Sequence, residues 1–262
     1  MVTEGLAAGI AYQESNPPGA AGPPLLLVHG AGGSRVHWPE GLRALPGRRV
    51  IAVDLPGHGR SPPPGERSVA AYARRVLALL DALEVPAAAV AGHSMGGAVA
   101  LTLGLTAPAR VAGLVLVGTG ARLRVAPAVL EATVDPAALA RAAQAMVENS
   151  FAPGASAALV APFVERLRAT APGVAHDDFA ACDAFDVMAR LGEMAVPALV
   201  VCGEEDRLTP PKYAEFLHAR LRGSRLLRLP AAGHMVAIEA AGPVAEAVGA
   251  FLRELAAAPV SG

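Results

Sequence analysis

The chain has 262 residues, of which 53% are hydrophobic, and its 22 Lys and Arg nearly balance its 23 Asp and Glu. This composition can fill a sizeable core and excludes a disordered or fibrous protein. The net charge of −1 gives no electrostatic basis for binding nucleic acid or an anionic membrane, so a small molecule is the expected partner.

The N-terminal segments are predicted to be strands. Residues 6–12 have the pattern of an edge strand, and the turn-forming residues 16–24 separate them from the apolar run at 25–28, which predicts a strand buried on both faces. Residues 1–12 lack the basic start and long apolar segment of a secretory signal, which favours a cytoplasmic protein.

The strand at 25–28 continues into the small-residue segment H-G-A-G-G-S at 29–34. Small residues let backbone N–H groups point at a ligand, and the Ala31 N–H is suited to one donor of an oxyanion hole. A dinucleotide-binding turn is the alternative, but Arg35 stands where the third glycine of that fingerprint belongs. We expect His29 to hold this loop through hydrogen bonds.

The next strand is predicted at residues 50–53 and leads into D-L-P-G-H-G-R-S at 54–61. This turn-forming run must pass close to other backbone, and its role is interpreted as architectural. Ser68 can cap a helix that extends to about Leu83, because apolar residues recur there at helical spacing.

Residues 85–109 contain no Asp, Glu, Lys or Arg, and by length alone they could span a membrane. Pro86 and Pro108 bound this stretch, and glycines interrupt it. It therefore indicates a buried strand over residues 87–91 and a helix over residues 95–105.

Between this strand and helix lies G-x-S-x-G, centred on Ser94. The chemistry needs glycines there because a serine in a tight strand-to-helix turn leaves no room for neighbouring side chains, and the turn exposes Oγ. Met95 begins the helix, so its N–H is free to donate to an oxyanion. In a chain with 28 Gly the pattern alone can arise by chance, so the identification depends on the other motifs.

A strand at residues 111–117 continues the alternation of strands and helices, which favours a mostly parallel sheet. Residues 120–191 then carry only helical patterns. We interpret them as a lid over the carboxyl edge of the sheet, since 70 residues of short helices would make a poor core for a second independent domain. The predicted helices of the lid cover residues 127–133, 136–149 (with Asp135 as cap), 156–170 and 177–191.

The strand pattern resumes at residues 198–202 and 225–229, and a closing helix is predicted at 243–255. Asp206 follows the first of these strands, and the Thr209-Pro210 pair already supplies the start of the next helix, which leaves Asp206 free for another task. His234 follows the second strand. Alone, Asp206 could be a turn or salt-bridge residue and His234 an ordinary loop histidine, but after Ser94 they complete a Ser, Asp, His order.

These motifs together resemble the α/β-hydrolase fold superfamily, in its lid-bearing, esterase-like branch. The matching segments are H-G-A-G-G-S at 29–34, D-L-P-G-H-G-R-S at 54–61, G-H-S-M-G-G at 92–97, G-E-E-D-R-L-T-P at 203–210 and A-G-H-M at 232–235. The resemblance implies a mostly parallel central sheet flanked by helices, with a core formed by residues 1–119 and 192–262 and a helical lid at 120–191.

By position, the resemblance implies that Ser94 is the nucleophile, His234 the general base and Asp206 its orienting acid, with Ala31 and Met95 as oxyanion-hole amides. Dehalogenases and epoxide hydrolases of this fold use an aspartate nucleophile, which Ser94 excludes. Prolyl aminopeptidases usually have tryptophan where Met95 stands. Perhydrolases and carbon–carbon bond hydrolases share the whole triad and are not excluded.

The sequence therefore predicts a cytoplasmic serine hydrolase that cleaves a small carboxylic ester through an acyl-enzyme, without a cofactor. Cys182 and Cys202 lie in segments of different character and have no metal-binding spacing, so no metal site is expected. The alternatives are lactone or carbon–carbon bond hydrolysis, acyl transfer or perhydrolysis in the same pocket, and a ligand-binding protein without turnover. Natural substrate and oligomeric state are not determined by these patterns.

Apolar side chains of the lid are expected to line the substrate pocket above Ser94. The candidates are Met146, Phe151, Phe163, Phe179, Phe185 and Met188.

Overall fold

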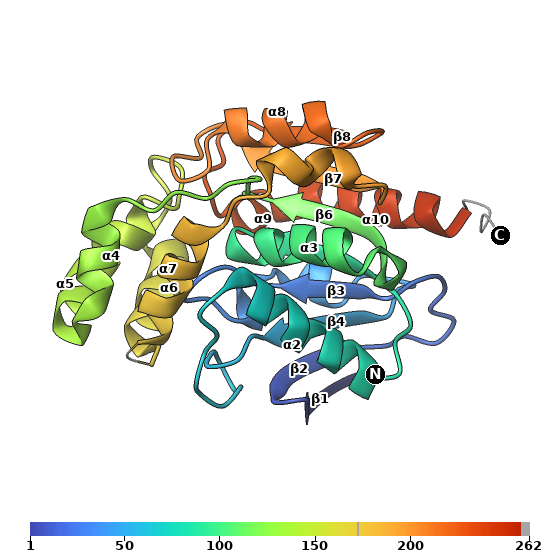
Figure 1. The fold of residues 1–262 in the computed structure, drawn as a ribbon, viewed down its shortest axis with the longest axis horizontal. Helices are drawn as coiled ribbons and strands as arrows, with labels where there is room; N and C mark the ends of the chain where they lie inside the picture. The colour runs from blue at the N-terminus through green and yellow to red at the C-terminus, as the bar shows by residue number, and fades with distance from the viewer. Residues whose placement is uncertain (172, 258–262) are drawn as a thin grey trace.

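The computed structural model describes residues 1–171 and 173–257, and at its centre is an eight-stranded sheet in the order β1-β2-β4-β3-β5-β6-β7-β8 (Figure 1). β1 pairs with β2, and β2 with β4, in antiparallel register, while the strands from β4 to β8 pair in parallel. The strands are β1 (Val2–Ala7), β2 (Ile10–Ser15), β3 (Leu25–Val28), β4 (Val50–Asp54), β5 (Ala88–His93), β6 (Val111–Val117), β7 (Ala198–Gly203) and β8 (Arg225–Leu229).

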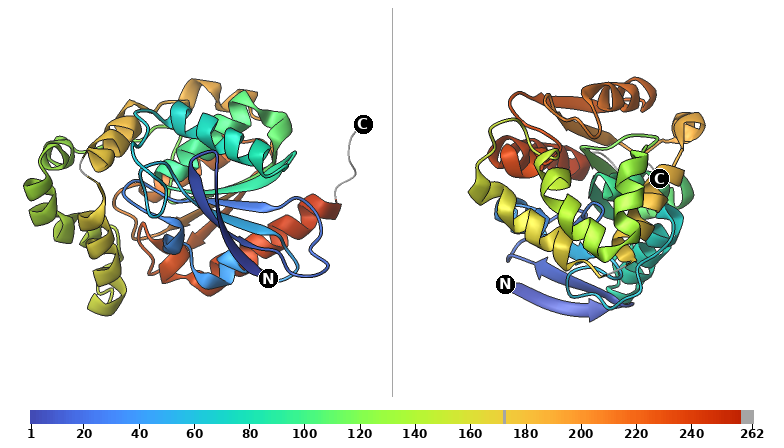
Figure 2. Two further views of the ribbon diagram at one scale, coloured as in Figure 1. Left: turned by 90° about the horizontal axis from the view of Figure 1, so that it is seen from below. Right: turned by 90° about the vertical axis from the view of Figure 1, so that its left-hand side faces the viewer.

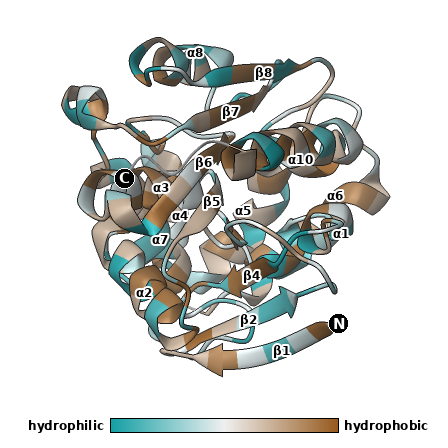
Figure 3. Ribbon diagram, turned by 90° about the vertical axis from the view of Figure 1, so that its right-hand side faces the viewer, coloured by the Kyte–Doolittle hydropathy of each residue, from teal (hydrophilic) through white to brown (hydrophobic). Residues whose placement is uncertain are grey.

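Helices cover both faces of this sheet and form two hydrophobic cores with it (Figure 2). One core lies beneath α2, α3 and α8, and the other beneath α1 and α10. Central strands such as β4 and β7 are buried along their whole length and mostly hydrophobic (Figure 3), because both of their faces are covered. The helices are α1 (Glu40–Arg43), α2 (Val69–Ala82), α3 (Met95–Thr106), α4 (Pro127–Val134), α5 (Pro136–Glu148), α6 (Ala157–Ala169), α7 (Val174–Ala184), α8 (Pro211–Arg220), α9 (Val236–Glu239) and α10 (Ala241–Ala257), with short 3₁₀ turns η1 (Arg35–His37), η2 (Pro108–Arg110) and η3 (Met188–Glu193).

Side-chain caps fix the starts of three helices where the sequence predicts them. Ser68 accepts a hydrogen bond from Ala71 N at 3.2 Å, and Ser156 accepts one from Leu159 N at 3.3 Å. The Asp135 carboxylate accepts from two backbone N–H groups of α5, both at 3.1 Å. Each cap satisfies N–H groups that have no partner inside the helix.

The N-terminal strand differs from the prediction for residues 6–12. Two strands, β1 and β2, form a hairpin there, joined by Ala8 and Gly9. Both of these residues have positive φ, 50° and 76°, which is the geometry of a tight hairpin turn. The turn was not predicted because Ala8 is not a residue that favours this conformation.

The helix predicted over residues 177–191 is also wrong in its bounds, since α7 begins at Val174 and ends at Ala184. Phe185 adopts an extended conformation, and its carbonyl accepts a hydrogen bond from Leu123 N at 3.3 Å. Val187 N donates to Ala121 O at 2.8 Å, so this chain segment pairs with residues 121–123 instead of continuing the helix.

Four helices, α4 to α7, lie between β6 and β7 in the chain and gather at one end of the sheet (Figure 1). Apolar side chains of α5, α6 and α7, with Phe151 between α5 and α6, form a small cluster of their own, which also includes Met235 from the loop after β8. Among the described residues, no helix has the length and apolar character needed to cross a membrane.

The segment at 54–61 serves as a buried junction. Asp54, only 1% exposed, accepts hydrogen bonds from Arg35 N at 2.8 Å, Arg35 Nη1 at 2.5 Å and Arg60 N at 3.0 Å. Arg35 is itself buried and also donates to Glu4. The carboxylate therefore joins the loop after β3 to the loop after β4 and neutralises a buried guanidinium.

Replacing Asp54 with Asn should destabilise the fold by about 3 kcal/mol, because it leaves a buried charge without its main partner. Urea unfolding at neutral pH measures this loss. Asp81→Asn is the matched control, since Asp81 pairs with Arg110 at 2.7 Å but is 65% exposed, and its loss should stay within about 1 kcal/mol. Equal losses in the two variants would contradict the role given to Asp54.

Candidate active site

Ser94 lies between β5 and α3 in a strained backbone conformation, with φ 53° and ψ −117°. Close approaches on both sides explain its glycine neighbours. A Cβ on Gly92 would lie 2.1 Å from Gly96 O, and a Cβ on Gly96 would lie 2.2 Å from Val28 O. Thr119 Oγ1 donates to Ser94 O at 2.8 Å and helps to hold the turn. Strain of this kind is typical of functional sites.

Asp206 and His234 meet at the ends of neighbouring strands. Asp206 follows β7, His234 follows β8, and Asp206 Oδ2 lies 2.9 Å from His234 Nδ1. Both residues are 4% exposed. Burial by itself raises the pKa of Asp206, but His234 and the hydrogen bonds from Thr209 stabilise the carboxylate, and the pKa lies below its ordinary value.

The neighbouring acids do not share this position. Glu204 and Glu205 are both exposed, and Glu204 pairs with Arg228 at 3.2 Å on the surface. The backbone of Glu205 donates to Ala232 O at 2.9 Å, which fixes the turn and directs the Asp206 side chain inward. The structure thus brings Asp206, and not its neighbours, to His234.

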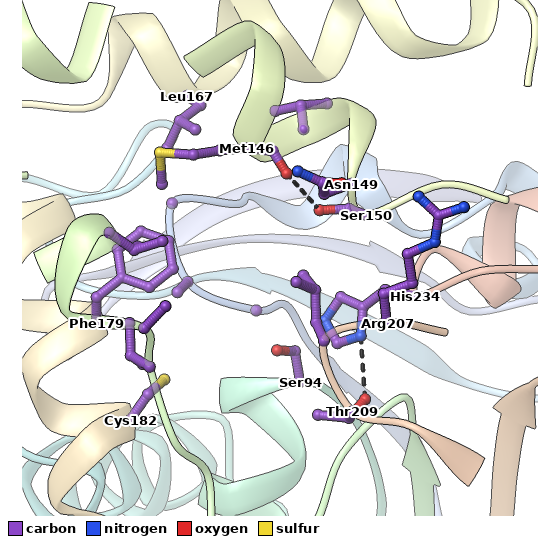
Figure 4. Close-up of a pocket in the computed structure, with 18 of the residues that line it drawn as sticks. Ser94, Met146, Asn149, Ser150, Leu167, Phe179, Cys182, Arg207, Thr209 and His234 are labelled. Carbon is purple, nitrogen blue, oxygen red and sulfur yellow. Dashed lines mark hydrogen bonds between the residues drawn. The ribbon is translucent and has the colours of Figure 1, made fainter. Parts of the chain in front are cut away.

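Two polar residues that were not among the predicted site residues complete this arrangement. Thr209 Oγ1 donates to Asp206 Oδ2 at 2.7 Å and lies 3.1 Å from His234 Nδ1 (Figure 4). His93 Nε2 donates to the backbone carbonyl of His234 at 3.0 Å. Burial, and then the neighbouring His234, lower the pKa of His93 to about 3, so His93 is a neutral donor. His93 and Thr209 belong to the motifs at 92–97 and 203–210, but their contacts with His234 form only when distant parts of the chain fold together.

Ser94 and His234 line the same pocket (Figure 4). Within the described part of the chain, the Ser94 hydroxyl makes no hydrogen bond to His234. Such bonds are often long without substrate and tighten when substrate binds.

The expected oxyanion donors lie on either side of Ser94. Met95 is the first residue of α3, so its N–H has no acceptor within the helix. A Cβ on Gly30 would lie 3.0 Å from Ser94 Cβ, which places the loop that carries Ala31 against the serine. Among the described residues, the Ala31 N–H has no hydrogen-bond acceptor.

The pocket has a volume of about 500 Å³, which suits a small molecule. Four of the six apolar residues expected to line it do so: Met146, Phe151, Phe163 and Phe179. Phe185 and Met188 do not, which corrects that expectation. Phe185 is buried in the core beneath α3, and Met188 packs against the same core. Both follow the end of α7, where the chain turns away from the pocket.

The charged residues that line the pocket, among those described, are Arg124 and Arg207, and both are exposed. The interior surface is otherwise mostly apolar. In the part of the chain that the structure describes, no group of His, Cys, Asp and Glu side chains is arranged to hold a metal ion.

Comparisons with known proteins identify the family of the chain. A family model described as alpha/beta hydrolase fold matches residues 23–241. The dihydrolipoyllysine-residue acetyltransferase component of the acetoin cleaving system of Pseudomonas putida is 36% identical, over 90% of this chain, which spans 65% of that protein. The pimeloyl-[acyl-carrier protein] methyl ester esterase of Neisseria meningitidis is 33% identical, over 79% of this chain and 84% of that protein. The solved structure of a thermophilic esterase is 33% identical, with a TM-score of 0.82. The match covers 97% of this chain and 98% of the esterase chain.

The lowered pKa of Asp206 predicts a pH-dependent contribution of Thr209 to stability. Because the folded pKa lies below the unfolded value, the ionised carboxylate stabilises the fold above about pH 4, and this stability is lost as the pH falls through the folded pKa. Thr209→Val should therefore cost about 1.5 kcal/mol at pH 7 and progressively less below pH 4. Urea unfolding across this range measures the difference.

Thr209→Ser keeps the hydroxyl and serves as the control, with most of the stability retained at pH 7. If Thr209→Val costs the same at pH 7 and at pH 3, the loss comes from packing and not from the hydrogen bond to Asp206.

Proposed function

This chain belongs to the α/β-hydrolase family, and on that premise we propose that it is a serine hydrolase that cleaves a small carboxylic ester through an acyl-enzyme. The observation that carries the proposal is the buried contact of 2.9 Å between Asp206 Oδ2 and His234 Nδ1, in a pocket that also contains the strained Ser94. This is the combination of nucleophile, base and orienting acid that acyl transfer needs.

In the proposed mechanism, Ser94 Oγ attacks the ester carbonyl while His234 Nε2 takes its proton. Asp206 fixes the imidazole tautomer and stabilises the imidazolium. The N–H groups of Ala31 and Met95 donate to the oxyanion of the tetrahedral intermediate. His234 then returns the proton to the leaving alcohol, and a water molecule, activated by the same histidine, hydrolyses the acyl-enzyme and frees the acid.

Two esterases among the relatives support ester hydrolysis, while the acetyltransferase component of Pseudomonas putida, at 36% identity, supports acyl transfer as the alternative. One is a methyl ester esterase and another a thermophilic esterase, with 33% identity in each case. Lactone opening, carbon–carbon bond hydrolysis, perhydrolysis and acyl transfer use the same residues, and a substrate panel separates them. We further propose a cytoplasmic location, where the free, buried Cys182 and Cys202 would stay reduced.

Asp206→Asn should lower kcat by about 10³- to 10⁴-fold, because the amide favours the wrong tautomer of His234. Steady-state kinetics on a p-nitrophenyl ester measures this, with Ser94→Ala as the baseline for turnover without the nucleophile. Glu205→Gln is the matched control, since it neutralises the adjacent, exposed acid and should leave kcat within about twofold. Equal damage from both variants would remove Asp206 from the proposed role.

The apolar pocket predicts a preference for medium-length acyl chains. Each buried methylene should add up to about 0.8 kcal/mol until the cavity is full, so kcat/KM should rise from acetate to a medium chain and then fall. Phe179→Ala enlarges the pocket and should move the optimum to longer chains. Phe216→Ala removes a half-buried ring from α8, away from the pocket, and should leave the optimum in place.

A flat profile would show that the pocket does not bind the acyl chain. A strong preference for esters with a free carboxylate would show that a polar group sets specificity, with Arg124 and Arg207 as the cations at hand.

A further inference from the structure

A fully buried carboxylate from the helical insertion, the helices α4 to α7, contacts the loop at residues 29–34 that carries Ala31 (the oxyanion loop). Asp178 lies on α7 and is 0% exposed. Its Oδ2 accepts hydrogen bonds from Gly32 N at 2.9 Å and His58 Nε2 at 2.7 Å, and its Oδ1 accepts one from Tyr72 OH at 2.6 Å. The donors come from three separate segments: the loop after β3, the loop after β4, and α2.

His58 balances the charge of this carboxylate. Its two ring nitrogens face Asp178 and the carbonyl of Pro56, which is 3.0 Å away, and both of these partners only accept hydrogen bonds. Opposite an ionised Asp178, both ring nitrogens must donate, so the ring then carries two protons and a positive charge. Burial by itself lowers the pKa of His58, but Asp178 raises it above its ordinary value. The ion pair prevents an uncompensated negative charge from lying beside the oxyanion hole.

A second helix of the insertion contacts the same glycine. Gly32 has φ +61°, and a Cβ on it would lie 2.7 Å from Leu167 Cδ1 on α6. Thr170 Oγ1 lies 3.5 Å from Gly32 O. Gly32 is thus held on its N–H side by α7 and on its other side by the end of α6. The N–H committed to Asp178 belongs to the residue directly after Ala31.

We propose that Asp178 is a positioning residue that holds the peptide after Ala31, so that the Ala31 N–H points at the oxyanion. This inference rests on the proposed function. It makes the competence of the oxyanion hole depend on the placement of α7, which also contributes Phe179 and Cys182 to the pocket. A substrate that packs against α7 therefore contacts the element that orients the oxyanion loop.

The test compares binding of a transition-state analogue with binding of a ground-state analogue. A trifluoromethyl ketone forms a hemiketal oxyanion with the serine and reports on the oxyanion hole, whereas the corresponding carbinol reports only on the pocket. Asp178→Ala should lower kcat about 10- to 100-fold with KM changed less than about threefold. The Ki of the ketone should rise by the same factor as kcat/KM falls, and the Ki of the carbinol should stay unchanged.

Three further variants keep the test independent of folding. In Asp178→Asn the amide oxygen can still accept from Gly32 N, while the amide nitrogen donates to the Tyr72 hydroxyl. This variant should therefore show a smaller loss of kcat and of ketone affinity than Asp178→Ala. It decides the matter if the alanine variant does not fold. Tyr72→Phe removes, of the three hydrogen bonds to Asp178, the one to Oδ1, and it should lower the melting temperature without changing the Ki of the ketone. Asp177→Asn, on the same helix, removes an acid that pairs with Arg67 at 3.6 Å, and it should match the wild type.

Wild-type values of kcat and ketone Ki in every Asp178 variant that folds, while the wild-type enzyme hydrolyses the ester, would overturn the inference and leave the proposed function standing. An equal loss of ketone and carbinol affinity would also overturn it, because that pattern indicates a collapsed pocket. Absence of ester turnover in the wild type would refute the proposed function, and this inference with it.

Discussion

The close approach of backbone around Ser94 is the constraint on which the rest of the site depends. A Cβ on Gly96 would lie 2.2 Å from Val28 O, so β3 and the start of α3 can pack together only without a side chain there. That contact brings the loop after β3 against Ser94, and it exposes the first N–H of α3 beside it. The strained φ of 53° at Ser94 persists because Thr119 and the glycine contacts fix the turn on both sides.

The helical insertion contacts the two loops that carry Ala31 and His234. Glu239 accepts hydrogen bonds from Gly233 N at 2.8 Å and from Ala152 N at 2.7 Å, so one carboxylate joins the loop of His234 to the insertion. Met235 N donates to Ser150 O at 3.0 Å in the same region. Together with the hydrogen bond from Gly32 N to Asp178 on α7, these contacts fix the loops that carry His234 and Ala31 against the helices that line the pocket.

Much of the molecule follows from local sequence patterns, and the α/β-hydrolase fold expected from its motifs is confirmed. Strands β3, β6 and β8 have the predicted bounds, because short apolar runs between turn residues specify them locally. The motifs predict Asp206 and His234 as site residues, and the structure brings them together. Asp178 carries no such signal, since its partners lie 106 to 146 residues away in the chain. Likewise, the sequence gives no reason to distinguish Phe179 from Phe185. Phe179 lies on α7 and lines the pocket, whereas Phe185 follows the end of α7 and lies in the core.

The acyl-enzyme mechanism is tested most directly by locating the covalent adduct. The protein is treated with a fluorophosphonate, digested with a protease and analysed by mass spectrometry, alongside the Ser94→Ala variant. We expect one phosphonyl group per chain, on the peptide that contains Ser94, with loss of ester turnover in step with labelling and no adduct on the variant. An adduct on a different residue, or full labelling with turnover intact, would contradict the assignment of Ser94 as the nucleophile.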